Sequence, residues 1–101
     1  MRPEVFQPQE LRALLKAFKE RYGTQYHLLT LGYFGSYARN EATTDSDVDV
    51  VFTTDQPDLF TTALLKQHLE AYLDRPVDVV RLRDAMNAKF KARIEREATY
   101  V

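Results

Sequence analysis

The chain has 101 residues, of which 45% are hydrophobic and 12% aromatic, with no cysteine and a formal net charge of −1. This length fits one domain, which we expect to span residues 1–101, while the absence of cysteine excludes disulfides and thiolate metal sites. The charge argues against direct nucleic-acid binding, and the lack of a long apolar run or apolar signal core predicts a cytoplasmic protein without membrane contact.

The first part of the chain predicts a helix followed by a buried strand. Leucine and aromatic residues recur at helical spacing over residues 8–22, and Gly23 suits the end of that helix. Residues 26–34 form a nearly continuous apolar run, which is typical of an inner strand. Gly32 within this run indicates a bulge or a close backbone approach.

A glycine turn follows this strand directly. Gly35 and Ser36 end the apolar run, and a short helix is expected over residues 36–41 with Ser36 at or near its cap. Asn40 suits the end of this helix because asparagine tolerates a positive φ. The polar residues 42–46 then predict a loop.

Two aspartates mark the second predicted strand, residues 47–53. Alternation along a strand sends Val48, Val50 and Phe52 to one face. If that face is buried, Asp47 and Asp49 must project together from the opposite face.

The second half of the chain predicts a long helix, a short strand and a final helix. The long helix starts at about residues 57–58 and ends before Pro76, where a proline cannot continue it. Residues 77–80 alternate so that Asp78 shares a face with Val80. An apolar ladder at every fourth position predicts a helix over residues 82–98.

These elements predict an α/β fold with a small three-stranded mixed sheet and helices packed mainly on one face. The other face would carry the aspartates. Between Arg39 and Lys66 there is no lysine or arginine, so this acidic region would repel phosphate unless a cation is bound there. We expect the basic C-terminal segment, residues 81–97, to be a solvated helix face.

The aspartates and the glycine turn together predict a metal–nucleotide site. Two carboxylates on alternate strand residues can converge on a hard cation, and Mg²⁺ in proteins is usually held by one or two carboxylates plus substrate phosphates. Asp78 on the neighbouring strand would add a third carboxylate, able to bind metal or to take a proton from an attacking hydroxyl. Gly35 allows close approach of the backbone to a phosphate, and Ser36 offers a hydroxyl and an N–H group.

The arrangement Gly35-Ser36, ten residues, then Asp47-Val48-Asp49 resembles the signature of the DNA polymerase β-like nucleotidyltransferases. The run GSYARNEATTDSDVDVVF followed by VDVV is similar to the minimal nucleotidyltransferases, the antitoxins paired with HEPN-domain ribonuclease toxins. The resemblance implies the nucleotidyltransferase fold and transfer of AMP from ATP, with Mg²⁺, to a tyrosine hydroxyl of the toxin in a hetero-oligomer.

Residue by residue, the resemblance implies that Gly35 and Ser36 hold the triphosphate and that Arg39 contacts phosphate or partner. Asp47, Asp49 and Asp78 would bind two Mg²⁺ ions, with Asp78 as the catalytic base. Asn40 stands where relatives commonly have glycine.

Two alternatives stay open from the sequence. One is a non-catalytic antitoxin that neutralises its toxin by binding, with a vestigial nucleotide site. The other is a nucleotidyltransferase acting on a small aminoglycoside-like hydroxyl, which the apparent lack of a substrate domain disfavours.

Overall fold

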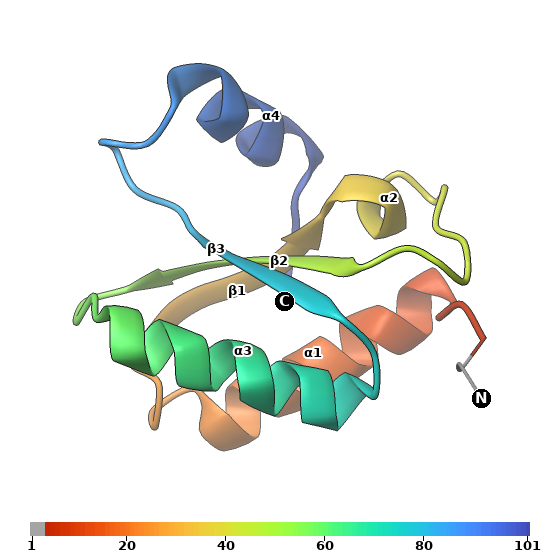
Figure 1. Cartoon of the computed structure of the whole chain (residues 1–101), viewed down its shortest axis with the longest axis horizontal. Coiled ribbons are helices and arrows are strands. Elements are labelled where there is room, and N and C mark those ends of the chain that lie inside the picture. Colours follow the sequence, from red (N-terminus) through yellow and green to blue (C-terminus); the bar gives the residue numbers. More distant parts are fainter. Residues whose placement is uncertain (1–3) are drawn as a thin grey trace.

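A computed structural model describes residues 4–101 of the chain. Figure 1 shows helices and strands alternating along the sequence. The helices are α1 (Pro8–Tyr22), α2 (Gly35–Ala38), α3 (Leu59–Leu73) and α4 (Ala88–Glu97). The strands are β1 (Leu28–Phe34), β2 (Val48–Thr54), β3 (Val77–Arg81) and β4 (Thr99–Tyr100).

Local side-chain contacts fix where the longer helices begin. At the start of α1, the backbone N–H of Gln7 donates to the Glu10 carboxylate at 3.2 Å, which completes a capping box. At the start of α3, the Asp58 carboxylate accepts from the backbone N–H of Phe60 at 2.7 Å. α4 begins after Asn87, whose side chain likewise accepts a backbone N–H of the first turn.

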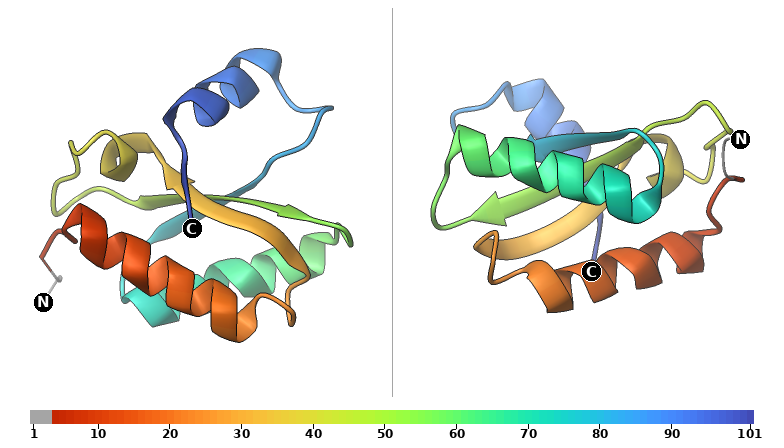
Figure 2. Two further views of the ribbon diagram at one scale, coloured as in Figure 1. Left: turned by 180° about the vertical axis from the view of Figure 1, so that it is seen from behind. Right: turned by 60° about the horizontal axis from the view of Figure 1, so that its bottom comes forward.

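The strands form one mixed sheet in the order β3-β2-β1-β4. β2 is parallel to β3, whereas β1 is antiparallel to both β2 and β4. Figures 1 and 2 show α1 and α3 covering one face of this sheet, with α4 on the opposite side together with the short α2. Within residues 4–101, no helix combines the length and apolarity that crossing a bilayer would need.

The two faces of the sheet carry two hydrophobic clusters. The larger cluster packs α1 and α3 against the sheet through fully buried side chains such as Leu15, Phe18 and Leu69. The smaller cluster lies under α4, where Ile94 packs against Phe34 and Val51. Strand alternation accounts for the division, because Val50 and Val51 are neighbours in β2 and face opposite clusters.

The α/β fold class predicted from the sequence is confirmed, with one additional strand. β4 pairs with β1, and the register sets Gly32 opposite Tyr100. A Cβ atom on Gly32 would lie 2.6 Å from the Thr99 carbonyl oxygen, so Gly32 provides the close backbone approach that the sequence indicates.

The aspartate face is less open than the sequence predicts, because α4 stands over part of it. α4 is also shorter than the predicted helix over residues 82–98. Residues 82–87 instead connect β3 to α4, and the backbone N–H of Leu82 donates to the Phe52 carbonyl at 2.9 Å. This hydrogen bond keeps residue 82 with the sheet, and the Asn87 cap sets the start of the helix.

Candidate active site

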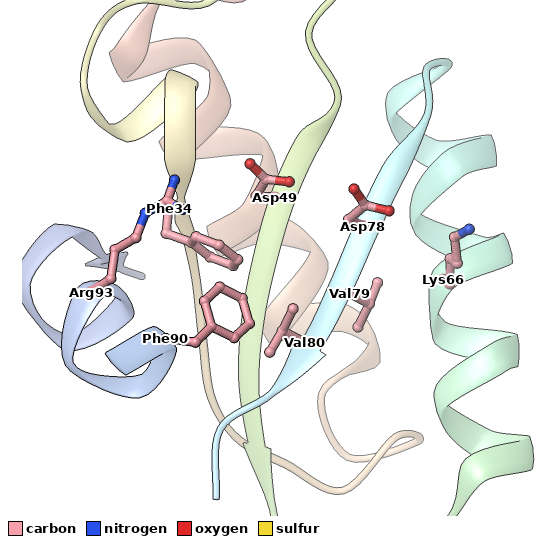
Figure 3. A pocket seen from close by; sticks show the side chains of 8 residues that line it. All are labelled: Phe34, Asp49, Lys66, Asp78, Val79, Val80, Phe90 and Arg93. Atoms are coloured by element: carbon pink, nitrogen blue, oxygen red, sulfur yellow. The ribbon is translucent and has the colours of Figure 1, made fainter. Parts of the chain in front are cut away.

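Two carboxylates lie next to each other on the face of the sheet that carries α4. The parallel register of β2 and β3 pairs Asp49 with Asp78, and the antiparallel register of β1 and β2 pairs Asp49 with Phe34. Figure 3 shows the Asp49 and Asp78 side chains side by side on their two strands. Both the shared face and the pairing follow from residue alternation plus register.

The carboxylate pair borders a cavity of about 480 Å³. Its remaining lining comes from four elements, as Figure 3 shows: Phe34 of β1, Val79 and Val80 of β3, Phe90 and Arg93 of α4, and Lys66 of α3. The rings of Phe34 and Phe90 meet edge to face, with centroids 6.0 Å apart. The cavity therefore joins an acidic end, two cationic side chains and an apolar wall.

The glycine turn abuts the more central of the two carboxylates. Gly35 has a φ of +71°, in the left-handed region that glycine adopts without strain. A Cβ atom at this position would collide with the Asp49 carboxylate. The backbone conformation thus favours glycine here, and any side chain at this position would have to displace the Asp49 carboxylate.

The short helix α2 spans Gly35–Ala38, so it starts one residue before the predicted range 36–41 and ends three residues earlier, although Asn40 does adopt the predicted positive φ. Asn40 has a φ of +58°, which asparagine tolerates better than most residues. Arg39, just before it, pairs with Glu41 at 3.3 Å and with Glu97 of α4 at 3.2 Å. Arg39 is therefore held between α2 and α4.

The pKa of Asp49 is raised above its ordinary value of 3.8. Burial of this carboxylate is the largest cause, followed by the negative charges of Asp78 and Asp47, while Arg93 and Arg39 act in the opposite direction. The neighbouring arginines therefore compensate the negative charge only in part. A bound divalent cation would relieve the remaining repulsion.

We expect Asp49→Asn to raise the free energy of unfolding at pH 7 in metal-free buffer. Since the native pKa lies above 3.8, the folded chain binds this proton more tightly than the unfolded chain does. The contribution of Asp49 to stability therefore falls as pH rises from 3.8 through the native pKa, and stays constant above it.

Urea denaturation between pH 3.5 and 7 tests this expectation by comparing the wild type with Asp49→Asn. The stability difference in favour of the variant should widen with rising pH. Asp55→Asn, the same chemical change at the exposed turn beyond the far end of β2, is the matched control. A difference that stays constant or narrows with pH would contradict the expected sign.

The structure brings the six predicted site residues together to different degrees. Asp49 and Asp78 line the cavity, and Gly35 touches Asp49. Asp47 is exposed just ahead of β2, and its charge still acts on Asp49. Ser36 and Arg39 follow the turn on α2, outside the lining of the cavity.

The carboxylate pair fits the chemistry of Mg²⁺ better than that of a metal held by protein alone. Among residues 4–101 no group of three or more His, Cys, Asp or Glu side chains is arranged to hold a metal ion. A carboxylate pair with uncompensated repulsion is the donor set expected where phosphate oxygens complete the coordination of Mg²⁺.

Part of the site was not predicted from the sequence. Four further residues line the cavity: Phe34, Lys66, Phe90 and Arg93. Phe90 and Arg93 belong to the basic C-terminal segment, which was expected to be only a solvated helix face. The available signal was the apolar ladder of that segment, since Phe90 and Ile94 must face the protein and Arg93 lies beside them.

The mixed sheet, the glycine turn at the end of β1 and the carboxylate pair on β2 and β3 define a nucleotidyltransferase. Residues 11–101 match the family model described as "Nucleotidyltransferase domain", and the chain belongs to this family. Among curated proteins it is similar to the protein adenylyltransferase MntA of Thermococcus cleftensis. The two are 33% identical over 94 residues, which cover 92% of this chain and 94% of that relative.

Solved structures show the same similarity. One, described as a candidate minimal nucleotidyltransferase, is 30% identical with a TM-score of 0.78 and covers 93% of this chain and 95% of its own. Two toxin–antitoxin structures share the fold at lower identity. The first, a toxin–antitoxin with AMP-PNP, is 22% identical with a TM-score of 0.69 and covers 94% of this chain and 72% of its own. The second, a tri-AMPylated Shewanella oneidensis HEPN toxin with its MNT antitoxin, is 23% identical with a TM-score of 0.65. It covers 93% of this chain and 71% of its own.

Proposed function

We propose that this chain is the antitoxin of a toxin–antitoxin pair and that it transfers AMP from ATP to a tyrosine hydroxyl of a HEPN-type ribonuclease toxin. The observation that carries the proposal is the Asp49–Asp78 carboxylate pair beside the Gly35 turn, at the edge of a cavity with cationic and apolar walls. The names of the similar proteins support AMP transfer and a toxin partner.

In this proposal Asp49 and Asp78, with Asp47 nearby, would hold Mg²⁺ together with the phosphates of ATP. Bound Mg²⁺ would neutralise negative charge on the phosphates. Gly35 and Ser36 supply backbone N–H groups and a hydroxyl to the triphosphate. The guanidinium groups of Arg39 and Arg93 add fixed positive charge, suited to phosphate oxygens.

Asp78 is the candidate base because of its place in the sheet. It lies on β3, an edge strand, and is exposed, whereas Asp49 lies on the inner strand β2 and is half-buried. A hydroxyl brought by another protein can reach the edge strand more easily. Asp78 would take the hydroxyl proton while the oxygen bonds to the α-phosphorus and the bond to the β-phosphate oxygen breaks, so that pyrophosphate leaves.

The apolar wall of the cavity is suited to the nucleoside part of ATP. Phe90 and Val80 present apolar surface within the same cavity as the carboxylate pair. An aromatic side chain can cover a base face without reading its hydrogen-bonding edge. This wall therefore predicts binding of the nucleobase with modest base selectivity.

The test is to incubate the purified chain with ATP, Mg²⁺ and the product of the neighbouring gene, as the candidate toxin, and to weigh that product by mass spectrometry. The expected result is a gain of one or more AMP units on the toxin, located on a tyrosine by fragmentation. The gain should disappear with the double variant Asp47→Ala, Asp49→Ala, and persist with the control Asp55→Ala. Neutralisation of the toxin without any mass gain, unaffected by the double variant, would instead support an antitoxin that acts by binding alone. Transfer to an aminoglycoside and not to the protein would support the small-molecule alternative.

A further inference from the structure

Glu97, the last residue of α4, lies between two arginines. Its carboxylate accepts from Arg39 Nη1 at 3.2 Å and from Arg93 Nε at 3.4 Å. One carboxylate thus has two guanidinium donors, one from the residue that follows α2 and one from its own helix.

The surroundings of Glu97 keep it ionised. Its side chain is 16% exposed, less than Arg39 at 38% or Arg93 at 47%. Burial would raise the pKa of this carboxyl, but the positive charges of Arg93 and Arg39 outweigh that effect and hold the pKa below its ordinary value. Glu97 is therefore ionised at neutral pH, in contact with both arginines.

The two arginines that pair with Glu97 are also linked to Asp49. Arg93 and Arg39 both act on the charge of Asp49, and Arg93 lines the cavity. Gly35 lies directly against the Asp49 carboxylate. An exposed ion pair between flexible side chains contributes little, but a shared carboxylate that joins several donors restricts them all.

We propose that Glu97 is a positioning residue that holds Arg39 and Arg93 in the arrangement that receives the phosphates of ATP. This inference rests on the proposed function. Glu97 need not touch the nucleotide. A guanidinium group held in one orientation loses less entropy when it binds phosphate than a free side chain does.

Binding of Mg²⁺–ATP and of AMP to the complete chain, measured by calorimetry, tests the inference. Glu97→Gln removes the charge and keeps the size of the side chain, and should weaken ATP binding about tenfold. The affinity for AMP, which has one phosphate, should change by less than about twofold. Glu95→Gln, the same change at an exposed position of α4, is the matched control and should leave both unchanged.

A double-mutant cycle separates positioning from a general effect on stability. In an Arg39→Ala, Arg93→Ala background, Glu97→Gln should weaken ATP binding by less than about twofold further. Glu97→Asp, which keeps the charge, should recover part of the affinity. If Glu97→Gln does not fold, Arg93→Lys is the second test variant. Lysine keeps the positive charge but lacks the planar guanidinium group, so this variant should lose affinity for ATP and not for AMP.

The outcomes distinguish this inference from the proposed function. A wild type that binds no ATP overturns both. If the wild type binds ATP and Glu97→Gln binds ATP with equal or higher affinity, only the positioning role is overturned. Tighter binding would mean that Glu97 occupies a phosphate position and competes with the nucleotide.

Discussion

Replacing Asp78 with asparagine is expected to slow AMP transfer about 10³-fold, within the range for loss of a positioned general base. ATP binding should change much less, because Asp49 and the Gly35 turn stay in place. The reason is the position of Asp78 on the edge strand β3, exposed and opposite Asp49. Asparagine has almost the same size but cannot accept the proton of an attacking hydroxyl.

Single-turnover transfer to the toxin and calorimetric titration of Mg²⁺–ATP would measure the two effects separately. Asp55→Asn, beyond the far end of β2, is the matched control and should transfer AMP at the wild-type rate. If Asp78→Asn lost ATP affinity and transfer in equal proportion, Asp78 would serve only in metal and nucleotide binding. Unchanged transfer would remove Asp78 from the site altogether.

Gly35→Ala is expected to abolish transfer and to destabilise the fold at the same time. The substitution forces a side chain into the left-handed region and sets a methyl group against the Asp49 carboxylate. The two effects together should lower the free energy of unfolding by about 2–4 kcal/mol. Urea denaturation measures that loss, and the transfer assay shows whether Asp49 has been displaced.

The double variant Gly35→Ala, Asp49→Ala tests the collision itself. Removing the carboxylate removes the atoms that the new methyl group would meet, so the added cost of Gly35→Ala should fall to that of the backbone conformation. Additive stability losses would show that the collision with Asp49 does not contribute. A Gly35→Ala variant with wild-type stability would contradict both causes.

Much of the site follows from local rules that a sequence displays. The alternation of valine and aspartate in β2 commits Asp49 to the face opposite Val48 and Val50, because those valines must be buried. The same rule applied to β3 predicts that Asp78 and Val80 lie on the same face of the strand. The positive φ of Asn40, just after α2, follows from the tolerance of asparagine for this conformation. These predictions need only the period of a strand and the conformational preference of one residue.

Other features depend on contacts between residues far apart in the chain. The two-residue strand β4 has no pattern of its own, and it exists because Gly32 lets the Thr99–Tyr100 backbone approach β1. That pairing brings the chain after α4 back to the sheet. Helical periodicity predicted that α4 has an apolar face, but it could not say which surface that face would cover.

The sequence by itself therefore determined the α/β fold class, the glycine turn and the face of its own strand that each carboxylate takes, since each depends on residues close together in the chain. Only the tertiary structure decided that Asp49 pairs with Asp78 and that α4 covers part of their shared face. Its packing brings Phe90 and Arg93 to the cavity and Glu97 to Arg39. The physical reason is that charge pairing and packing act between whole elements, and their partners are fixed by the register of the sheet and not by spacing along the chain.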